Sequence, residues 1–134
     1  MISTDLALAL RDAGLVWHPA SGDRFQLDEP EFEADVYTAS EMTIEPRNYP
    51  TGVILAFNGT TEWALDSVAL EDALWLPRED QLRKLLRATF RSLTRLEDTY
   101  RVDAVIQGEP LSFEYPEPAD AYALALLALV RRSA

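Results

Sequence analysis

Residues 77–130 read PREDQLRKLLRATFRSLTRLEDTYRVDAVIQGEPLSFEYPEPADAYALALLALV, and this stretch decides the fold. Pro77 is preset for a first helical turn, and leucines at helical spacing follow it up to about Ala88. From Thr89 onward β-tolerant residues alternate in polarity. We therefore expect a strand over 89–96, with a continued helix as the open alternative.

The second half of this stretch predicts two more strands and a helix. Residues 100–106 and 111–115 are strand candidates, and Gly108 between them indicates a turn. Pro116 and Pro118 then lead into an Ala/Leu-rich helix that ends the chain. The order from residue 77 is therefore helix, three strands, helix.

The first half begins with a helix and continues as strands. Ser3 or Thr4 can cap a helix that Gly14 ends. Residues 53–57, Val-Ile-Leu-Ala-Phe, predict a central strand, and Asn58-Gly59 indicates a hairpin turn after it. Further strands are expected at 15–17, 24–27, 36–38, 42–44 and 61–65, and a turn-rich segment at 46–52. For residues 60–68 a short helix is the alternative to a strand.

These elements define an α+β protein. The order is α, several strands, α, three strands, α, and short connections favour antiparallel sheets with the three helices on one face. The chain has 134 residues, of which 48% are apolar and 10% aromatic, and this composition excludes a disordered chain. We expect one α+β domain over residues 1–134.

Charge is unevenly distributed along an acidic chain. The sequence has 23 Asp and Glu against 12 Lys and Arg, a formal net charge of −11. Residues 78–95 oppose this trend, with six basic and two acidic residues and a net charge of +4. A negative field repels phosphates and anionic lipids, so neither nucleic acid nor a membrane is an expected partner.

Several kinds of chemistry are excluded by residue types that the chain lacks. It has no cysteine, which removes disulfide scaffolds, thiolate metal sites and cysteine nucleophiles. His18 is the only histidine, and no glycine belongs to a P-loop or a dinucleotide-binding motif. We therefore expect no metal, no cofactor and no catalytic residue.

The expected location is the cytoplasm. Asp5 stands where a signal peptide carries basic residues. The most apolar run, residues 119–130, is shorter than the roughly 20 residues that span a bilayer.

Two surfaces are candidates for interaction with a partner. Arg87, Arg91 and Arg95 would form a line on a continuous helix, while on a strand Arg91 and Arg95 would share a face. Either arrangement favours an acidic protein partner, or an acidic segment of a second copy. The last helix has almost no polar face, so its Leu126 and Leu129 are candidates for a homodimer contact, and full burial within the monomer is the alternative.

A ligand cleft is the alternative site. Aromatic and polar residues gather at predicted strand ends and turns, where ligand sites are common. If His18 acted as a base, Asp23 would be the nearest carboxylate to orient it. The candidate cleft residues are Trp17, His18, Asn58, Thr60, Thr61 and Trp63.

Two segments, FNGTTEWALDSV at 57–68 and ALWLPREDQL at 73–82, resemble segments of small bacterial proteins of about this length. Proteins of that group often carry the label "pilus assembly protein CpaE" and lack the ATPase domain of larger CpaE proteins. The resemblance implies a compact stand-alone domain, transfers no catalytic residue, and suggests an accessory role in pilus or secretion assembly.

The sequence thus favours a small non-enzymatic protein–protein interaction module that forms a homodimer. A small hydrolase or ligand-binding protein with a cleft near His18 and Trp63 is the alternative hypothesis.

Overall fold

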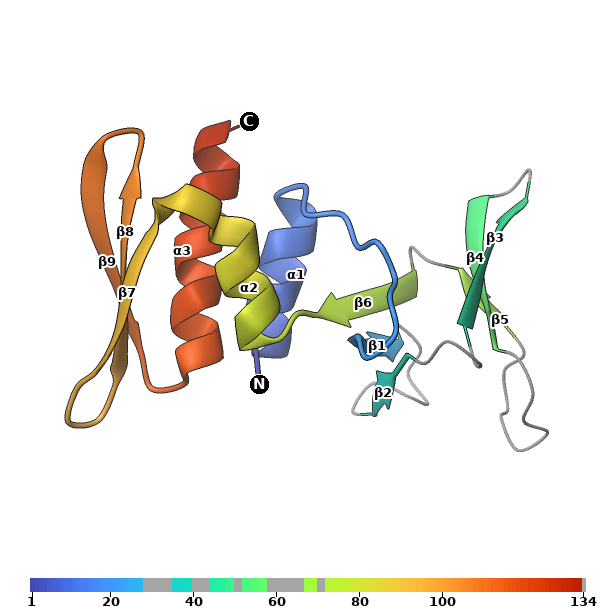
Figure 1. Ribbon diagram of the computed structural model, residues 1–134. Coiled ribbons are helices and arrows are strands. Elements are labelled where there is room, and N and C mark those ends of the chain that lie inside the picture. The colour runs from blue at the N-terminus through green and yellow to red at the C-terminus, as the bar shows by residue number, and fades with distance from the viewer. Residues whose placement is uncertain (28–34, 40–43, 50–51, 58–66, 70–71, 134) are drawn as a thin grey trace. The chain divides into compact units, whose positions relative to one another are not determined.

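The computed structural model describes residues 1–27, 35–39, 44–49, 52–57, 67–69 and 72–133 (Figure 1). Within these residues the helices and strands follow one another as α1, β1 to β6, α2, β7 to β9 and α3, which confirms the α+β class and the expected order. The chain divides into two compact units. Unit 1 comprises Met1–Val16 with Leu76–Ala134, and unit 2 comprises Trp17–Trp75. The single domain over 1–134 stays a prediction.

Unit 1 contains a three-stranded antiparallel sheet. Its strands β7 (Phe90–Arg95), β8 (Tyr100–Ile106) and β9 (Glu109–Tyr115) lie in sequence order, so β7 and β9 are the edges. Gln107 and Gly108 make the turn between β8 and β9 with positive φ angles of 52° and 79°. The strand expected over 89–96 and the turn at Gly108 are therefore confirmed.

The last helix, α3 (Pro118–Ser133), is the centre of unit 1. It contacts β8 and β9 on one side and also contacts α1 and α2, so that in Figure 1 the helices lie on one side of the sheet. The side chains of Val102, Ala104 and Ile106 on β8 are buried on this face. A helix that packs against a sheet and two helices has little surface left for water, which explains why α3 is apolar almost all round.

Helix α1 (Thr4–Asp12) begins and ends as the sequence predicted. The Ser3 hydroxyl accepts a hydrogen bond from the Leu6 amide at 3.3 Å, and Gly14 ends the helical region with φ of 114°. The amide of Ser3 donates to the Asp120 carboxylate of α3 at 2.7 Å. This bond ties the start of α1 to the first turn of α3.

Helix α2 (Glu79–Leu86) starts two residues after Pro77. The Arg78 amide donates to Gln81 Oε1 at 2.9 Å, which satisfies one donor at the helix start. After Leu86 a short 3-10 turn, Arg87–Thr89, leads directly into β7. The continued helix over 89–96 is thereby wrong, and the strand alternative holds.

Unit 2 holds an aromatic core beside a small sheet. Strands β2 (Val36–Thr38), β1 (Arg24–Leu27) and β6 (Ala73–Leu76) are neighbours in that order, and β1 and β2 are antiparallel. Trp17 and Phe25 form the centre of the core with ring centroids 5.4 Å apart. Strand β6 was not expected from the sequence.

A second sheet of unit 2 corrects the expectation for residues 46–52. Strands β3 (Ile44–Tyr49), β4 (Gly52–Phe57) and β5 (Ser67–Ala69) are antiparallel, with β4 in the middle as predicted for residues 53–57. Pro46 is part of β3, opposite Leu55, and not of a turn. Proline has no backbone N–H to donate. It is tolerated in β3 because β3 is an edge strand, which pairs with another strand on one side only.

The strand expected at 15–17 is wrong. Residues 15–20 form neither helix nor strand, and Trp17 is drawn into the aromatic core with 7% of its surface exposed. Its indole Nε1 donates a hydrogen bond to Asp23 Oδ2 at 2.9 Å. The hairpin turn at Asn58-Gly59 lies outside the described residues. Of residues 60–68, expected as a strand or a short helix, 60–66 also lie outside them, and Ser67 and Val68 belong to a strand.

Candidate interaction surface

The basic residues of α2 and of the turn that follows it are exposed because the helix buries its opposite face. Leu82 and Leu86 have no exposed surface, whereas Arg83, Lys84 and Arg87 are exposed to water. Residues three and four apart share one face of a helix, so burial of the two leucines turns the intervening cations outward. We call Arg83, Lys84 and Arg87, together with Arg91 and Arg95 of β7, the basic surface.

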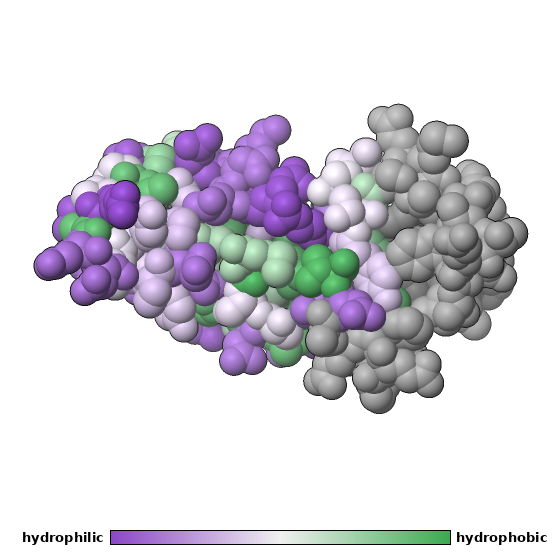
Figure 2. Space-filling model, turned by 90° about the horizontal axis from the view of Figure 1, so that it is seen from below, coloured by the Kyte–Doolittle hydropathy of each residue, from purple (hydrophilic) through white to green (hydrophobic). Residues whose placement is uncertain are grey.

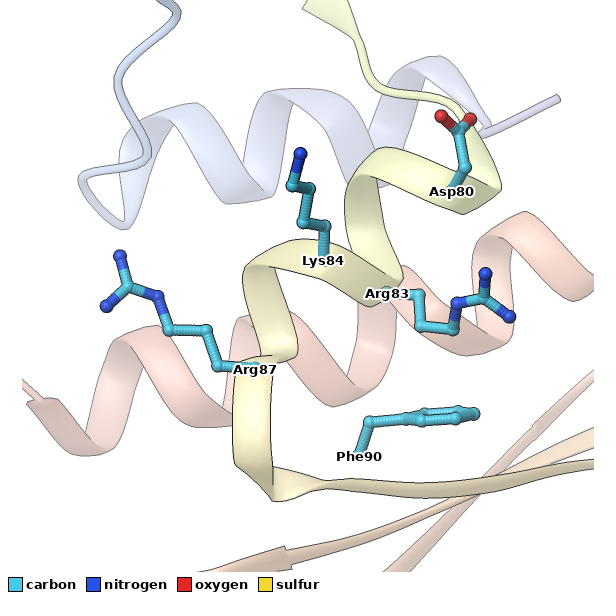
Figure 3. A pocket seen from close by; sticks show the side chains of 5 residues that line it. All are labelled: Asp80, Arg83, Lys84, Arg87 and Phe90. Atoms are coloured by element: carbon cyan, nitrogen blue, oxygen red, sulfur yellow. The ribbon is translucent and has the colours of Figure 1, made fainter.

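An open cavity of about 600 Å³ lies where α2 meets the start of β7. Figure 3 shows that its lining side chains do not converge on one point: Arg83 reaches along the side of α2 that faces Phe90, while Lys84 and Arg87 extend in other directions. Cations that point in different directions suit several separated carboxylates better than one small anion. The lining residues are Asp80, Arg83, Lys84, Arg87 and Phe90.

The charged residues of the cavity and of the basic surface differ in whether they have an ion-pair partner within the described chain. Asp80 accepts from Arg78 Nε at 3.2 Å, so the one acid of the cavity already has a basic partner. Among the described residues, no carboxylate oxygen lies within 4.0 Å of a charged nitrogen of Lys84, Arg87 or Arg95. Their positive charges are therefore available to a partner.

Arg83 and Phe90 also contact α3 through Tyr122. The Phe90 and Tyr122 rings lie 5.7 Å apart. Burial raises the pKa of Tyr122, and Arg83 acts in the opposite direction through its charge and a side-chain hydrogen bond. Arg83 is thus a structural contact as well as part of the basic surface.

Arg87 adopts a backbone conformation that an L-residue seldom takes. It ends α2 with φ of 53° and ψ of −132°. Such conformations cost of order 1–3 kcal/mol and persist where the surroundings enforce them. A glycine would be free of this cost, yet the position carries an exposed cation.

Relief of this strain is testable with Arg87→Gly. We expect the free energy of unfolding to rise by about 1 kcal/mol, because the strain removed exceeds the added freedom of the unfolded chain. Urea denaturation of the full chain measures the change. Gln107→Gly is the matched control, since φ at Gln107 is 52° and that residue lies outside the basic surface. A less stable Arg87→Gly variant would contradict this account of the backbone.

Strand β7 brings together only part of the predicted arginine line. A bulge between Phe90 and Ser92 displaces Arg91, whose Nη1 donates to the carbonyls of Ala88 and Phe90. Beyond the bulge, exposed and half-buried residues alternate along β7, and Leu93 and Arg95 are the exposed ones. The row of three arginines that a continuous helix would form is therefore absent, because the 3-10 turn at Arg87–Thr89 and the bulge interrupt the helical spacing.

The two leucines predicted for a dimer contact lie in different surroundings. Leu126 has 2% of its surface exposed and is buried within the chain, whereas Leu129 is half-buried. Packing of α3 in unit 1 leaves Leu126 almost no surface for a second copy. Leu129 retains some exposed surface.

The candidate cleft is described only in part. His18 is exposed, and Asp23 uses Oδ2 to accept from Trp17 Nε1 and from the Ala20 amide at 3.0 Å. The Asp23 carboxylate therefore holds the 17–23 segment together. Asn58, Thr60, Thr61 and Trp63 lie outside the described residues, so the cleft stays a prediction.

A polar cluster that was not predicted crosses the outer face of the unit 1 sheet. Ser92 Oγ donates to Asp103 at 3.2 Å, and Ser112 Oγ donates to it at 2.5 Å from the opposite strand. These bonds, the Ser112 bond first, and the Arg101 guanidinium at 3.1 Å lower the pKa of Asp103. The cluster links all three strands, and the lowered pKa makes the Asp103 carboxylate a weak base toward the two serines.

Two further kinds of site can be assessed over the described part of the chain. No group of three or more His, Asp or Glu side chains there could hold a metal ion. None of its helices combines the length and the apolar character needed to cross a membrane.

The net charge of the chain belongs almost entirely to one unit. Unit 1 has 11 acidic and 10 basic residues, whereas unit 2 has 12 acidic and 2 basic residues, a net charge of −10. The basic surface thus belongs to a nearly neutral unit. Figure 2 shows that hydrophilic side chains surround smaller hydrophobic patches on the face in view.

Sequence reasoning missed part of this surface. Arg83 and Lys84 were visible in the basic run 78–95 but not as site residues, and Phe90 gave no signal as a cavity residue. Their position relative to Leu82 and Leu86 was the available indication. Comparisons of the chain with protein-family models, with curated proteins and with solved structures found no match.

Proposed function

We propose that this protein is a non-enzymatic protein–protein interaction module that binds an acidic protein partner through its basic surface. The proposal rests on the exposure of Lys84, Arg87 and Arg95 and on the distance of these residues from the described carboxylates. All three are exposed, and no carboxylate among the described residues lies within ion-pair distance. Exposed charges that have no ion-pair partner within the described part of the chain attract an opposite charge on another molecule.

The arrangement of charges favours a protein over other anions. A single phosphate is best held by donors that converge, and these side chains diverge (Figure 3). DNA or RNA would also meet the field of a chain with a net charge of −11. Acidic side chains spread over a protein surface match the diverging cations, and their charge density is lower than that of a phosphate backbone, so this field opposes them less.

Self-association belongs to the same proposal. Unit 2 carries the acidic charge that the basic surface would attract, so a second copy is one candidate partner. A cytoplasmic location and an accessory role in pilus or secretion assembly are further proposals, which rest on the sequence alone. Sedimentation at micromolar concentration tests self-association, and a monomer at every concentration would contradict it.

The decisive experiment replaces Lys84, Arg87 and Arg95 together with Glu and measures binding of a labelled deca-glutamate peptide by fluorescence anisotropy. We expect the triple variant to bind at least tenfold more weakly, because each exposed charge contributes roughly 0.2–1 kcal/mol and its reversal adds repulsion. Binding by the unchanged protein should also weaken as salt is raised.

The matched control reverses Arg11, Arg131 and Arg132, which also belong to unit 1 but lie outside the basic surface. Both variants change the net charge by the same amount. They differ in location, and Arg11 and Arg132 already have ion-pair partners in Asp12 and Glu109. Equal loss of binding in the two variants, or no binding by the unchanged protein at low salt, would contradict the proposed function.

A further inference from the structure

The free edge of the unit 1 sheet lies within the basic surface. Strand β7 has β8 on one side and no strand on the other within the described chain. Edge strands expose backbone N–H and C=O groups that can pair with another extended chain. The bulge at the start of β7 leaves residues 92–95 as the regular part of this edge.

Strand β7 also has uncovered side chains on the face that the helices occupy elsewhere. Leu93 stands opposite Val102 of β8, and Val102 has no exposed surface. Leu93 therefore shares the helix-facing side of the sheet, but it is 38% exposed because α3 covers mainly β8 and β9. Arg95, two residues further on, lies on the same side and is exposed.

We infer that the partner binds as an extended acidic segment that adds to β7 as a fourth strand, with its carboxylates directed toward Arg95 and the α2 cations. The inference rests on the proposed function and specifies how the partner binds. Backbone hydrogen bonds to residues 92–95 supply affinity independent of sequence, and the arginines select for acidic side chains. The methylene groups of those acidic side chains cover Leu93.

Charge decides which extended chain this edge accepts. Arg91 and Arg95 of β7, together with Arg83 of α2, oppose the approach of a basic or a second β7 edge. The same edge therefore resists pairing with its own copy while it attracts a strand rich in Glu or Asp. The exposed cations thus protect the edge and select its partner.

The test uses the full ¹⁵N-labelled chain and a synthetic peptide of four Glu-Thr repeats, followed by NMR titration. In an added strand only alternate residues direct their N–H groups toward the neighbouring strand. Two further peptides carry N-methyl groups on either the Glu or the Thr residues. We expect the amides of residues 92–95 to shift, and one methylated peptide to bind at least tenfold more weakly than the other.

Each outcome separates the inference from the proposed function. If the two methylated peptides bind equally well, strand addition is wrong although the basic surface still binds acidic chains. If the unmethylated peptide does not bind, or a Lys-Thr peptide binds equally, both proposals fail. If the amides of residues 92–95 shift with protein concentration and the Glu-Thr peptide does not reverse this, β7 pairs with the β7 of a second copy and the inference is overturned.

Discussion

Replacement of Asp120 by Ala is expected to lower the free energy of unfolding by about 2–3 kcal/mol. Asp120 is buried, with 4% of its surface exposed, and its Oδ1 accepts from the Ser3 amide at 2.7 Å. A hydrogen bond to a charged group contributes about 1.5–3 kcal/mol, and its loss leaves the Ser3 amide without this partner. The carboxylate also lies in the first turn of α3, where the helix dipole favours an anion.

Urea denaturation measures this change, and Glu117→Gln provides the control. Glu117 lies near the same end of α3 and contacts the N-terminal ammonium at 4.0 Å, but its side chain is 62% exposed. An exposed ion pair of this kind contributes at most about 1 kcal/mol. If Asp120→Ala proved no more destabilising than Glu117→Gln, the bond between α1 and α3 would have no role in stability.

Leu86→Ala is expected to destabilise the protein by about 3 kcal/mol. Leu86 has no exposed surface and lies in the last turn of α2, a helix of 8 residues that contacts α3. Truncation of a buried leucine loses transfer free energy and leaves a cavity. A helix this short is unstable alone, so α2 depends on such packing to present the basic surface.

Leu85→Ala is the matched variant, because Leu85 is adjacent and only half-buried. We expect it to lose about 1 kcal/mol in the same thermal or urea experiment. Equal effects of the two substitutions would show that α2 is not anchored through Leu86.

Many elements were predictable because their signals are local. Ser3 and Gly14 delimit α1 through a side-chain cap and a positive φ, both of which depend only on neighbouring residues. Residues 100–106 were predicted as a strand, and in β8 the buried residues stand at alternate positions. The order of elements follows from such signals.

The corrected expectations depended on neighbours distant in sequence. Trp17 lies in an aromatic core with Phe25 and not in a strand, and Pro46 lies in a strand because β3 is at an edge. The apolar surface of α3 indicated either a dimer or burial within the chain, and the sequence could not decide between them. Contacts with β8, β9, α1 and α2 bury most of it.

The sequence by itself determined the helices and strands of unit 1, their order and the presence of a basic segment at 78–95, since these depend on residue type and local spacing. Tertiary structure alone decided which cations form one surface. Burial of Leu86, the left-handed backbone at Arg87 and the bulge after Phe90 set the direction of each basic side chain. These features arise from packing against α3 and pairing with β8, which bring together residues that the sequence keeps apart.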